Sequence, residues 1–163
     1  MKQINIRTVA LIVTIQLLAA VDIKADDKPV QIALFNPVQI FSSETAISGV
    51  RFNLVYGSNA SVTGLDFGLV NRTTDKQSVG VQWGLLGLSE RGFKGFQVNA
   101  VNITNEEFIG VQFGFVNAVE DGNGVMIGVI NFARRMYGLQ IGIINLISEG
   151  GAAPLLPIVN WSF

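Results

Sequence analysis

The side chains best suited to chemistry in this sequence lie in short polar segments. Adjacent carboxylates occur at Glu106-Glu107 and at Glu120-Asp121, and such a pair can act as general acid and base or hold a calcium ion. Arg134-Arg135 could contact lipid phosphates. Because charged residues at polar turns are usually solvated, the sequence favours a turn role for all of these pairs.

Two glycine-containing segments approximate nucleotide-binding motifs, and neither fits. Segment 122–128 has the wrong spacing for a dinucleotide fingerprint and opens an expected strand rather than a helix. In segment 87–94, Phe93 separates Gly92 from Lys94 and no Ser or Thr follows, which is incompatible with a phosphate loop. The chain has no Cys and no His, which excludes thiol nucleophiles and the commonest general base. We predict no catalytic residue, cofactor or metal site, and no enzymatic activity.

A short sequence motif that repeats about every fifteen residues accounts for most of the chain. Its pattern is Gly-apolar-Gln-apolar-Gly-apolar-apolar-Asn, as in residues 110–117 and 138–145. Apolar residues alternate within each copy, which indicates a β-strand with one apolar face. The phase slips after the third apolar residue, so each strand should end or bend near its Asn. The copies span 49–56, 64–71, 80–87, 95–102, 110–117, 124–131 and 138–145, with Asn53 and Asn99 in place of the second Gly.

The composition agrees with a single apolar β domain behind an export signal. The 163 residues are 49% hydrophobic and 14% charged, with 18 Gly. Lys2 and Arg7 precede an apolar run over 9–21 that is short for a membrane-spanning helix, which needs about 20 residues. We predict a signal peptide over 1–25, with an uncleaved anchor as the alternative, and one repeat-built β domain over 26–163. Cleavage removes three basic residues and one acidic residue, so the net charge changes from -1 to -3, which argues against nucleic acid as a partner.

Two all-β architectures fit the repeat. In a small antiparallel transmembrane barrel, each copy is one strand, its apolar residues face lipid, and its Gly and Gln positions face the lumen. In a parallel β-solenoid of about 15-residue coils, the apolar residues face inward, the Gln positions face outward, and the Asn residues stack at a corner. The lumenal set is Arg51, Asp66, Gln82, Gln97, Gln112, Met126 and Gln140, and the corner set is Asn71, Asn102, Asn117, Asn131 and Asn145.

Three features favour the barrel. Val159, Trp161 and Phe163 alternate with small or polar residues at the end of the sequence. Gly would weaken outward solenoid strands, whereas it makes room for large side chains in a narrow lumen. A solenoid this poor in charge would also expose an adhesive surface to water. We therefore predict a barrel of about eight strands, with the solenoid as the alternative, although the apolar strands are short for the roughly 25 Å membrane band.

Residues 157–163 resemble the C-terminal signal of outer-membrane barrel proteins, with Trp161 and Phe163 in the closing strand. Residues 49–163 resemble bacterial surface-repeat proteins, whose tandem units follow the same Gly-apolar-Gln-apolar-Gly-apolar-apolar-Asn pattern. These resemblances imply an exported envelope protein, in the outer membrane or at the cell surface of a Gram-negative-type bacterium. The partners expected are outer-membrane lipid and the barrel-assembly machinery, with no extracellular ligand identified.

The function predicted from these features is that of a non-catalytic outer-membrane barrel with a structural or surface-interaction role. The alternative is a secreted or surface-attached solenoid that serves as a binding or adhesion module. Arg51 and Asp66, the only charges inside repeat copies, lie one period apart and should pair on neighbouring strands. On the barrel hypothesis Phe113 faces lipid, Gln112 faces the lumen, and a larger side chain at Gly114 overpacks the interior.

Overall fold

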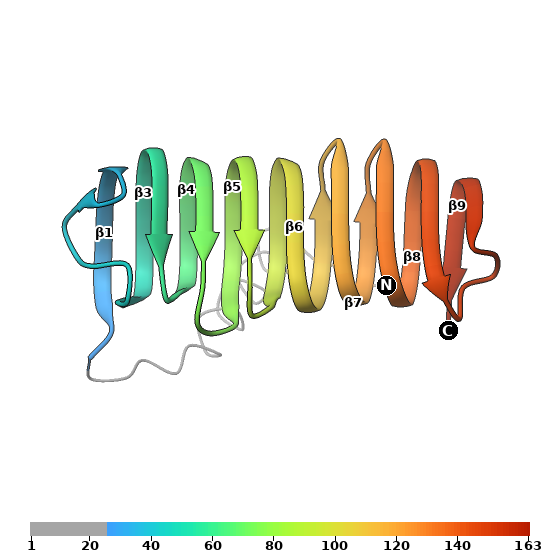
Figure 1. Cartoon of the computed structure of the whole chain (residues 1–163), viewed down its shortest axis with the longest axis horizontal. Coiled ribbons are helices and arrows are strands. Elements are labelled where there is room, and N and C mark those ends of the chain that lie inside the picture. The colour runs from blue at the N-terminus through green and yellow to red at the C-terminus, as the bar shows by residue number, and fades with distance from the viewer. Residues whose placement is uncertain (1–25) are drawn as a thin grey trace, which may run out of the picture.

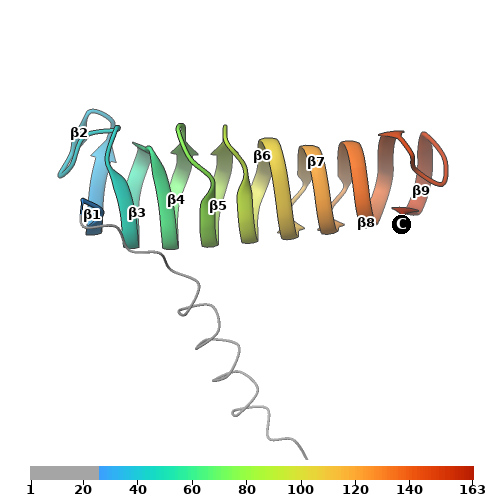
Figure 2. The ribbon, with the colours of Figure 1, turned by 90° about the horizontal axis from the view of Figure 1, so that it is seen from below.

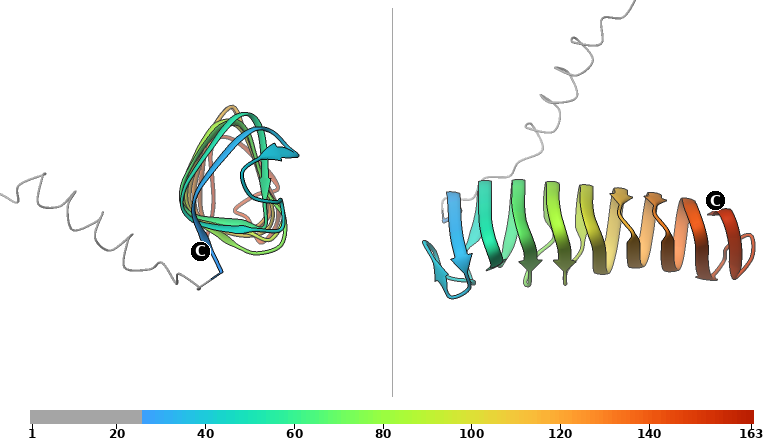
Figure 3. Two further views of the ribbon diagram at one scale, coloured as in Figure 1. Left: turned by 90° about the vertical axis from the view of Figure 1, so that its left-hand side faces the viewer. Right: turned by 90° about the horizontal axis from the view of Figure 1, so that it is seen from above.

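The computed structural model describes residues 26–163, which wind into a β-solenoid whose strands stack along one long axis (Figures 1 and 2). The strands form one nine-stranded sheet in the order β2-β1-β3-β4-β5-β6-β7-β8-β9. Seen end-on, successive coils superpose as closed loops (Figure 3). The strands are β1 (Lys28–Phe35), β2 (Val38–Gln39), β3 (Ala46–Asn59), β4 (Ser61–Thr73), β5 (Ser78–Ser89), β6 (Phe93–Phe113), β7 (Val116–Ile127), β8 (Ile130–Glu149) and β9 (Leu155–Ser162).

The coils stack in parallel and in register. Neighbouring strands from β1 and β3 through β8 pair parallel, and the glycine that opens each repeat copy lies beside the glycine of the next. Gly49 pairs with Gly64 and Gly64 with Gly80, so one coil takes 15 residues and the next takes 16. Gly124 pairs with Gly138, a coil of 14 residues. The sequence repeat is therefore one turn of the solenoid.

The predicted antiparallel barrel is wrong, and the β-solenoid alternative is correct. The physical reason lies in the polar segments that resemble hairpin turns in the sequence. The 21-residue strand β6 runs through Glu106-Glu107, and the 20-residue strand β8 runs through Arg134-Arg135. These charges occupy a bend of a continuing strand, which brings the chain round to start the next coil in the same direction.

The inward and outward faces differ from those of the solenoid alternative. Phe113 and Trp83 are 54% and 60% exposed, whereas Gln112 and Gln82 are fully buried. On this side of the coil the amides face inward and the apolar side chains face outward, the arrangement that the sequence analysis assigned to a barrel. Burial of amides is tolerable here because stacking brings each amide within hydrogen-bonding distance of the next.

Two further inward columns complete the interior. One column is polar in the first coils, at Asn59 and Thr73, and apolar in the later coils, at Val119 and Ala133. The other contains Ile47 and Val62 in the first coils, and Ser78 followed by Phe93 further along. One hydrophobic cluster fills the later half. The cluster consists of Phe93, Phe108, Val119, Met126, Ala133, Met136 and Ile147.

The terminal coils differ from the others. β2 pairs antiparallel with β1, and β9 pairs antiparallel with β8. The prediction that Trp161 and Phe163 belong to a barrel-closing strand is therefore wrong. Trp161 lies opposite Leu139 and is half exposed, while the Phe163 ring packs edge-on against Tyr137. The predicted signal peptide, 1–25, lies outside the described residues, and no helix among residues 26–163 is long and apolar enough to span a membrane.

Candidate interaction face

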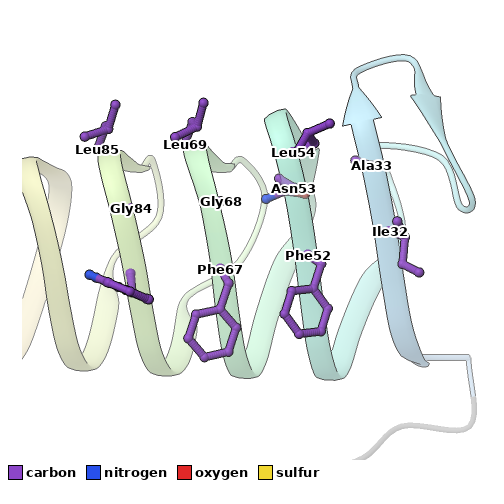
Figure 4. A pocket seen from close by; sticks show the side chains of 11 residues that line it. Ile32, Ala33, Phe52, Asn53, Leu54, Phe67, Gly68, Leu69, Gly84 and Leu85 are labelled. Carbon is purple, nitrogen blue, oxygen red and sulfur yellow. The ribbon is translucent and has the colours of Figure 1, made fainter.

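Two parallel ridges of apolar side chains run along the outside of the solenoid. The ridges flank a column of small residues, and together they form the surface that we call the apolar face (Figure 4). The first ridge is Ile32, Phe52, Phe67, Trp83, Val98, Phe113, Ile127 and Ile141; the second is Leu54, Leu69, Leu85, Ala100, Phe115, Val129 and Ile143; the column between them is Ala33, Asn53, Gly68, Gly84, Asn99, Gly114, Gly128 and Gly142.

The ridges enclose a shallow axial groove. Its first section, near β1 to β5, has a volume of about 630 Å³, and its second section has about 500 Å³. Rings stack along the first ridge, with the Phe52 and Phe67 centroids 5.5 Å apart and Trp83 edge-on to Phe67 at 6.2 Å. Because strand alternation repeats in every coil, the groove is a consequence of the sequence period.

Gly residues in the groove floor are required by close packing of the coils. A Cβ atom at Gly114 would overlap the backbone carbonyl oxygen of Asn99 and lie 2.8 Å from the side-chain nitrogen of Asn102. The glycine that opens each copy has a positive φ, 136° at Gly110, and its Cβ would overlap the carbonyl oxygen of Gly95. The expected intolerance of Gly114 thus has a different cause from a crowded barrel lumen.

Beneath the face, the buried Gln positions form a ladder of side-chain hydrogen bonds. The Gln112 amide donates to Gln97 Oε1 at 2.8 Å, and the Gln97 amide donates to Gln82 Oε1 at 3.1 Å. The Gln82 amide then donates to Asp66 Oδ2 at 2.9 Å. All bonds point the same way, so the ladder ends on a carboxylate, the strongest acceptor available.

Arg51 and Asp66 form the ion pair expected from their spacing, inside a solenoid rather than a lumen. Arg51 Nε and Nη2 donate to the two carboxylate oxygens at 2.7 and 2.8 Å. The remaining guanidinium nitrogen donates to the Arg72 carbonyl oxygen at 2.9 Å and to Asn59 Oδ1 at 3.2 Å. Both charges are buried, and each has several hydrogen bonds, which is the condition for such a pair to be tolerated.

The ladder is interrupted where Met126 replaces Gln. The Gln140 amide contacts Met126 Sδ at 3.6 Å and donates to the Leu146 carbonyl oxygen at 3.2 Å. Gln112 Oε1 has no hydrogen-bond partner among residues 26–163, because the next coil offers a thioether in place of an amide. The buried column therefore carries two acceptors without a partner among residues 26–163, Gln112 Oε1 and Gln140 Oε1, on either side of Met126.

The corner Asn residues form a second ladder. Asn102, Asn117 and Asn131 each donate to the Asn of the following coil at 2.8 Å, ending at Asn145. Each also donates to a backbone carbonyl, as Asn117 does to Ile127 at 3.0 Å. These amides hold the bend at which the strand turns the corner.

The two irregular copies have a packing explanation. Asn99 occupies a Gly position of the pattern, and Gly87 occupies an Asn position in the previous coil. The Asn99 amide donates to Gln82 Oε1 at 3.1 Å and to Asn102 Oδ1 at 2.6 Å, and a Cβ at Gly87 would lie 2.5 Å from the Asn99 amide nitrogen. Asn99 thus fills the space that Gly87 leaves, as Asn53 does beside Gly57.

The charged segments form a separate edge of inter-coil ion pairs. Arg134 pairs with Glu120 and Glu149, and Arg135 donates to Asp121 at 2.5 and 2.8 Å. The hydrogen bond from Arg135 lowers the pKa of the Asp121 carboxyl, and the same bond raises the pKa of Arg135. The acidic pairs considered for acid–base or calcium chemistry are therefore largely engaged by arginine, and no group of three or more metal-binding side chains occurs in the described part of the chain.

Polar side chains that the sequence analysis did not select also lie in the interior. Gln31 continues the Gln column into β1, where its side chain bonds the Phe41 backbone at 2.8 and 3.0 Å. Asn160 lies opposite Gln140 and is fully buried. The motif Val30-Gln31-Ile32 was the available signal for the first, although Pro29 replaces the opening Gly.

Comparison of this chain with protein-family models, with curated proteins and with solved structures finds no match.

Proposed function

We propose that this chain is a non-catalytic interaction module of the bacterial cell envelope, exported to the cell surface, in which a β-solenoid presents the apolar face to a partner. The observation that carries the proposal is the exposure of both ridges along the whole solenoid, as at Leu54, Trp83 and Phe113, which are 66%, 60% and 54% exposed. Monomeric soluble proteins rarely expose contiguous apolar patches larger than a few hundred Å². A surface of this kind is usually covered.

The division of the surface supports a binding role. Apolar side chains occupy the face, whereas the charged side chains gather on the edge and pair with one another. The residue types that could have acted in catalysis thus take part in inter-coil contacts. Export remains a prediction from residues 1–25, and a role for the barrel-assembly machinery is no longer proposed because β9 pairs with β8 as a terminal strand.

A fractionation experiment tests this proposal. We expect the full chain, expressed in a Gram-negative host, to be recovered in the envelope and to be accessible at the cell surface. A variant with Leu54→Ser, Trp83→Ser and Phe113→Ser should be exported and then lost from the envelope.

The matched control removes an exposed ion pair on the charged edge, Arg91→Ser with Glu106→Ser, whose side chains are 59% and 51% exposed. This control should remain in the envelope with the parent chain. Recovery of the parent in the cytoplasm, or equal envelope retention of the face variant, would contradict the proposed function.

A further inference from the structure

We infer that the partner covering the apolar face is a second copy of this chain, packed face to face with the two solenoid axes antiparallel. The inference rests on the proposed function, because it names the partner of the same surface. The observations that carry it are the area of the face, its period, the sizes of its ridge side chains and the distribution of charge.

The area matches that of a stable dimer interface. Coils spaced by about 4.8 Å give the face a length of roughly 40 Å. The outward strand segment that carries it is about six residues, as from the exposed Leu65 to Val70, which is about 20 Å wide. The product, roughly 800 Å² for each copy, is about what each partner buries in an interface of standard size.

The period of the face favours a partner with the same period. Ridge residues recur once per coil, as Phe113, Ile127 and Ile141 do on paired strands. Only a surface with the same axial spacing can seat its side chains between these ridges over the full length. A second copy meets this condition, because its ridge side chains can fit between successive ridge side chains of the first copy along the axis.

The sizes of the side chains along the first ridge determine the orientation. The end near β3 to β5 carries the rings of Phe52, Phe67 and Trp83, and the end near β7 and β8 carries Ile127 and Ile141. Antiparallel axes place large side chains opposite smaller ones and keep the gap between the copies even, whereas parallel axes place rings against rings.

The distribution of charges and prolines disfavours other modes of association. Neither ridge contains a charged residue, so two faces can meet without burying charge, and no basic side chain on the ridges is available to a lipid phosphate. All four prolines, Pro29, Pro37, Pro154 and Pro157, lie in the terminal coils. Proline lacks the amide hydrogen needed to extend a strand ladder, which disfavours end-to-end stacking.

The mass of the full chain in solution tests the inference. By light scattering, we expect the protein purified from whole cells to have twice the mass that the same preparation shows for one chain under denaturing conditions. The Leu54→Ser, Trp83→Ser, Phe113→Ser variant should have the single-chain mass with the β-sheet circular dichroism of the parent, and the Arg91→Ser, Glu106→Ser control should stay dimeric.

Single cysteines test the orientation, because the chain has none of its own. In an antiparallel pair, Val98 lies near the midpoint of the first ridge and approaches its own copy, whereas Ile32 approaches Ile141. A bifunctional maleimide that spans the roughly 10 Å between packed sheets should link Val98→Cys to itself. Ile32→Cys should link to Ile141→Cys in a mixture and not to itself. Self-linkage of Ile32→Cys would overturn the antiparallel arrangement.

The failure of this inference differs from the failure of the proposed function. A parent chain that is monomeric at 100 µM, yet binds phosphatidylcholine vesicles through the face, would overturn the dimer and assign the face to lipid. A monomer that binds neither vesicles nor an apolar dye would overturn both proposals. The parent dimer, together with a monomeric face variant, supports the inference independently of where the protein is located in the cell.

Discussion

The first and last coils of the solenoid share one backbone plan and differ in what fills it. Around β3 and β4 the interior contains the Arg51–Asp66 pair with Asn59 and Thr73, all buried. Around β7 and β8 the equivalent columns contain Val119, Met126, Ala133 and Ile147. Both regions keep the outward apolar ridges and the glycine that opens each coil, so the outer geometry does not depend on the polarity of the interior.

In both regions each column must match from coil to coil, whatever its chemistry. Polar columns are held by directional bonds, such as Gln82 to Asp66, that fix which residue lies above which. Apolar columns gain stability from burial with less directional constraint. Where the two kinds meet, at Gln112 and Met126, an acceptor is left without a partner among residues 26–163. The predictions below probe this boundary.

The largest effect should come from breaking the buried ion pair. Asp66→Ala leaves the Arg51 guanidinium buried without its carboxylate, and should lower the free energy of unfolding by about 4 kcal/mol. The double variant Arg51→Met, Asp66→Leu should lose less, because no buried charge remains. Equilibrium urea unfolding of the single and double variants provides the measurement. Equal losses in all variants would indicate that the pair is solvated.

An exchange of Gly87 and Asn99 should expose the coupling between neighbouring coils. Gly87→Asn alone should destabilise the fold by about 2 kcal/mol through overpacking against Asn99. Asn99→Gly alone should cost about as much, through loss of the hydrogen bond to Gln82 and the space left behind. The double variant restores the repeat pattern in both coils and should lie within about 1 kcal/mol of the parent. Additive losses of stability in the double-mutant cycle would show that the two positions do not compensate each other.

Extending the polar ladder into the apolar half should stabilise the protein. Met126→Gln offers an amide donor to Gln112 Oε1 and an acceptor to the Gln140 amide, a gain of about 1 kcal/mol. Met126→Leu, the matched apolar control, should give no gain. Thermal melting of the variants distinguishes the outcomes, and a lower melting temperature for Met126→Gln than for Met126→Leu would contradict the account.

The smallest effect should be the pH dependence contributed by the charged edge. The hydrogen bond from Arg135 lowers the pKa of Asp121 from its ordinary 3.8, so its stabilisation is present above that pH and is lost as the pH falls through the lowered value. The Asp121 side chain is 37% exposed, so the loss should be at most about 0.5 kcal/mol. The stability profiles of the parent and Asp121→Asn should converge in acid. Profiles that stay parallel down to acid pH would exclude this contribution.

Sequence reasoning could reach the repeat and the strand alternation, because both follow from residue spacing. It could not decide which face points inward: the Gln column was expected inside only on the barrel hypothesis, and the solenoid alternative placed it outside. The pairing of Arg51 with Asp66 also follows from their separation by one period. The direction of neighbouring strands could not be obtained this way, since alternation is the same in parallel and antiparallel strands. Charged segments such as Glu106-Glu107 resemble turns, although they lie within β6.

The close packing of the groove floor and the complementary packing of Gly87 and Asn99 could not be predicted from the sequence either. That Gly114 packs against the Asn99 backbone depends on the distance between stacked coils, which no local pattern encodes. The same holds for Asn99 filling the space beside Gly87, because the two residues belong to different copies. Gln31 was overlooked because Pro29 and Pro37 interrupt the pattern in its coil.

Cross-linking of cysteine pairs distinguishes parallel from antiparallel stacking of the coils. Val81 lies beside Phe96 on the paired strands β5 and β6, whereas an antiparallel hairpin would place Val81 near Val101. In the solenoid, Val101 lies beside Leu86, further along the coil. A short thiol cross-linker should join Val81→Cys to Phe96→Cys within one chain and should leave Val81→Cys with Val101→Cys unlinked. Efficient linkage of the second pair, with none of the first, would contradict the solenoid.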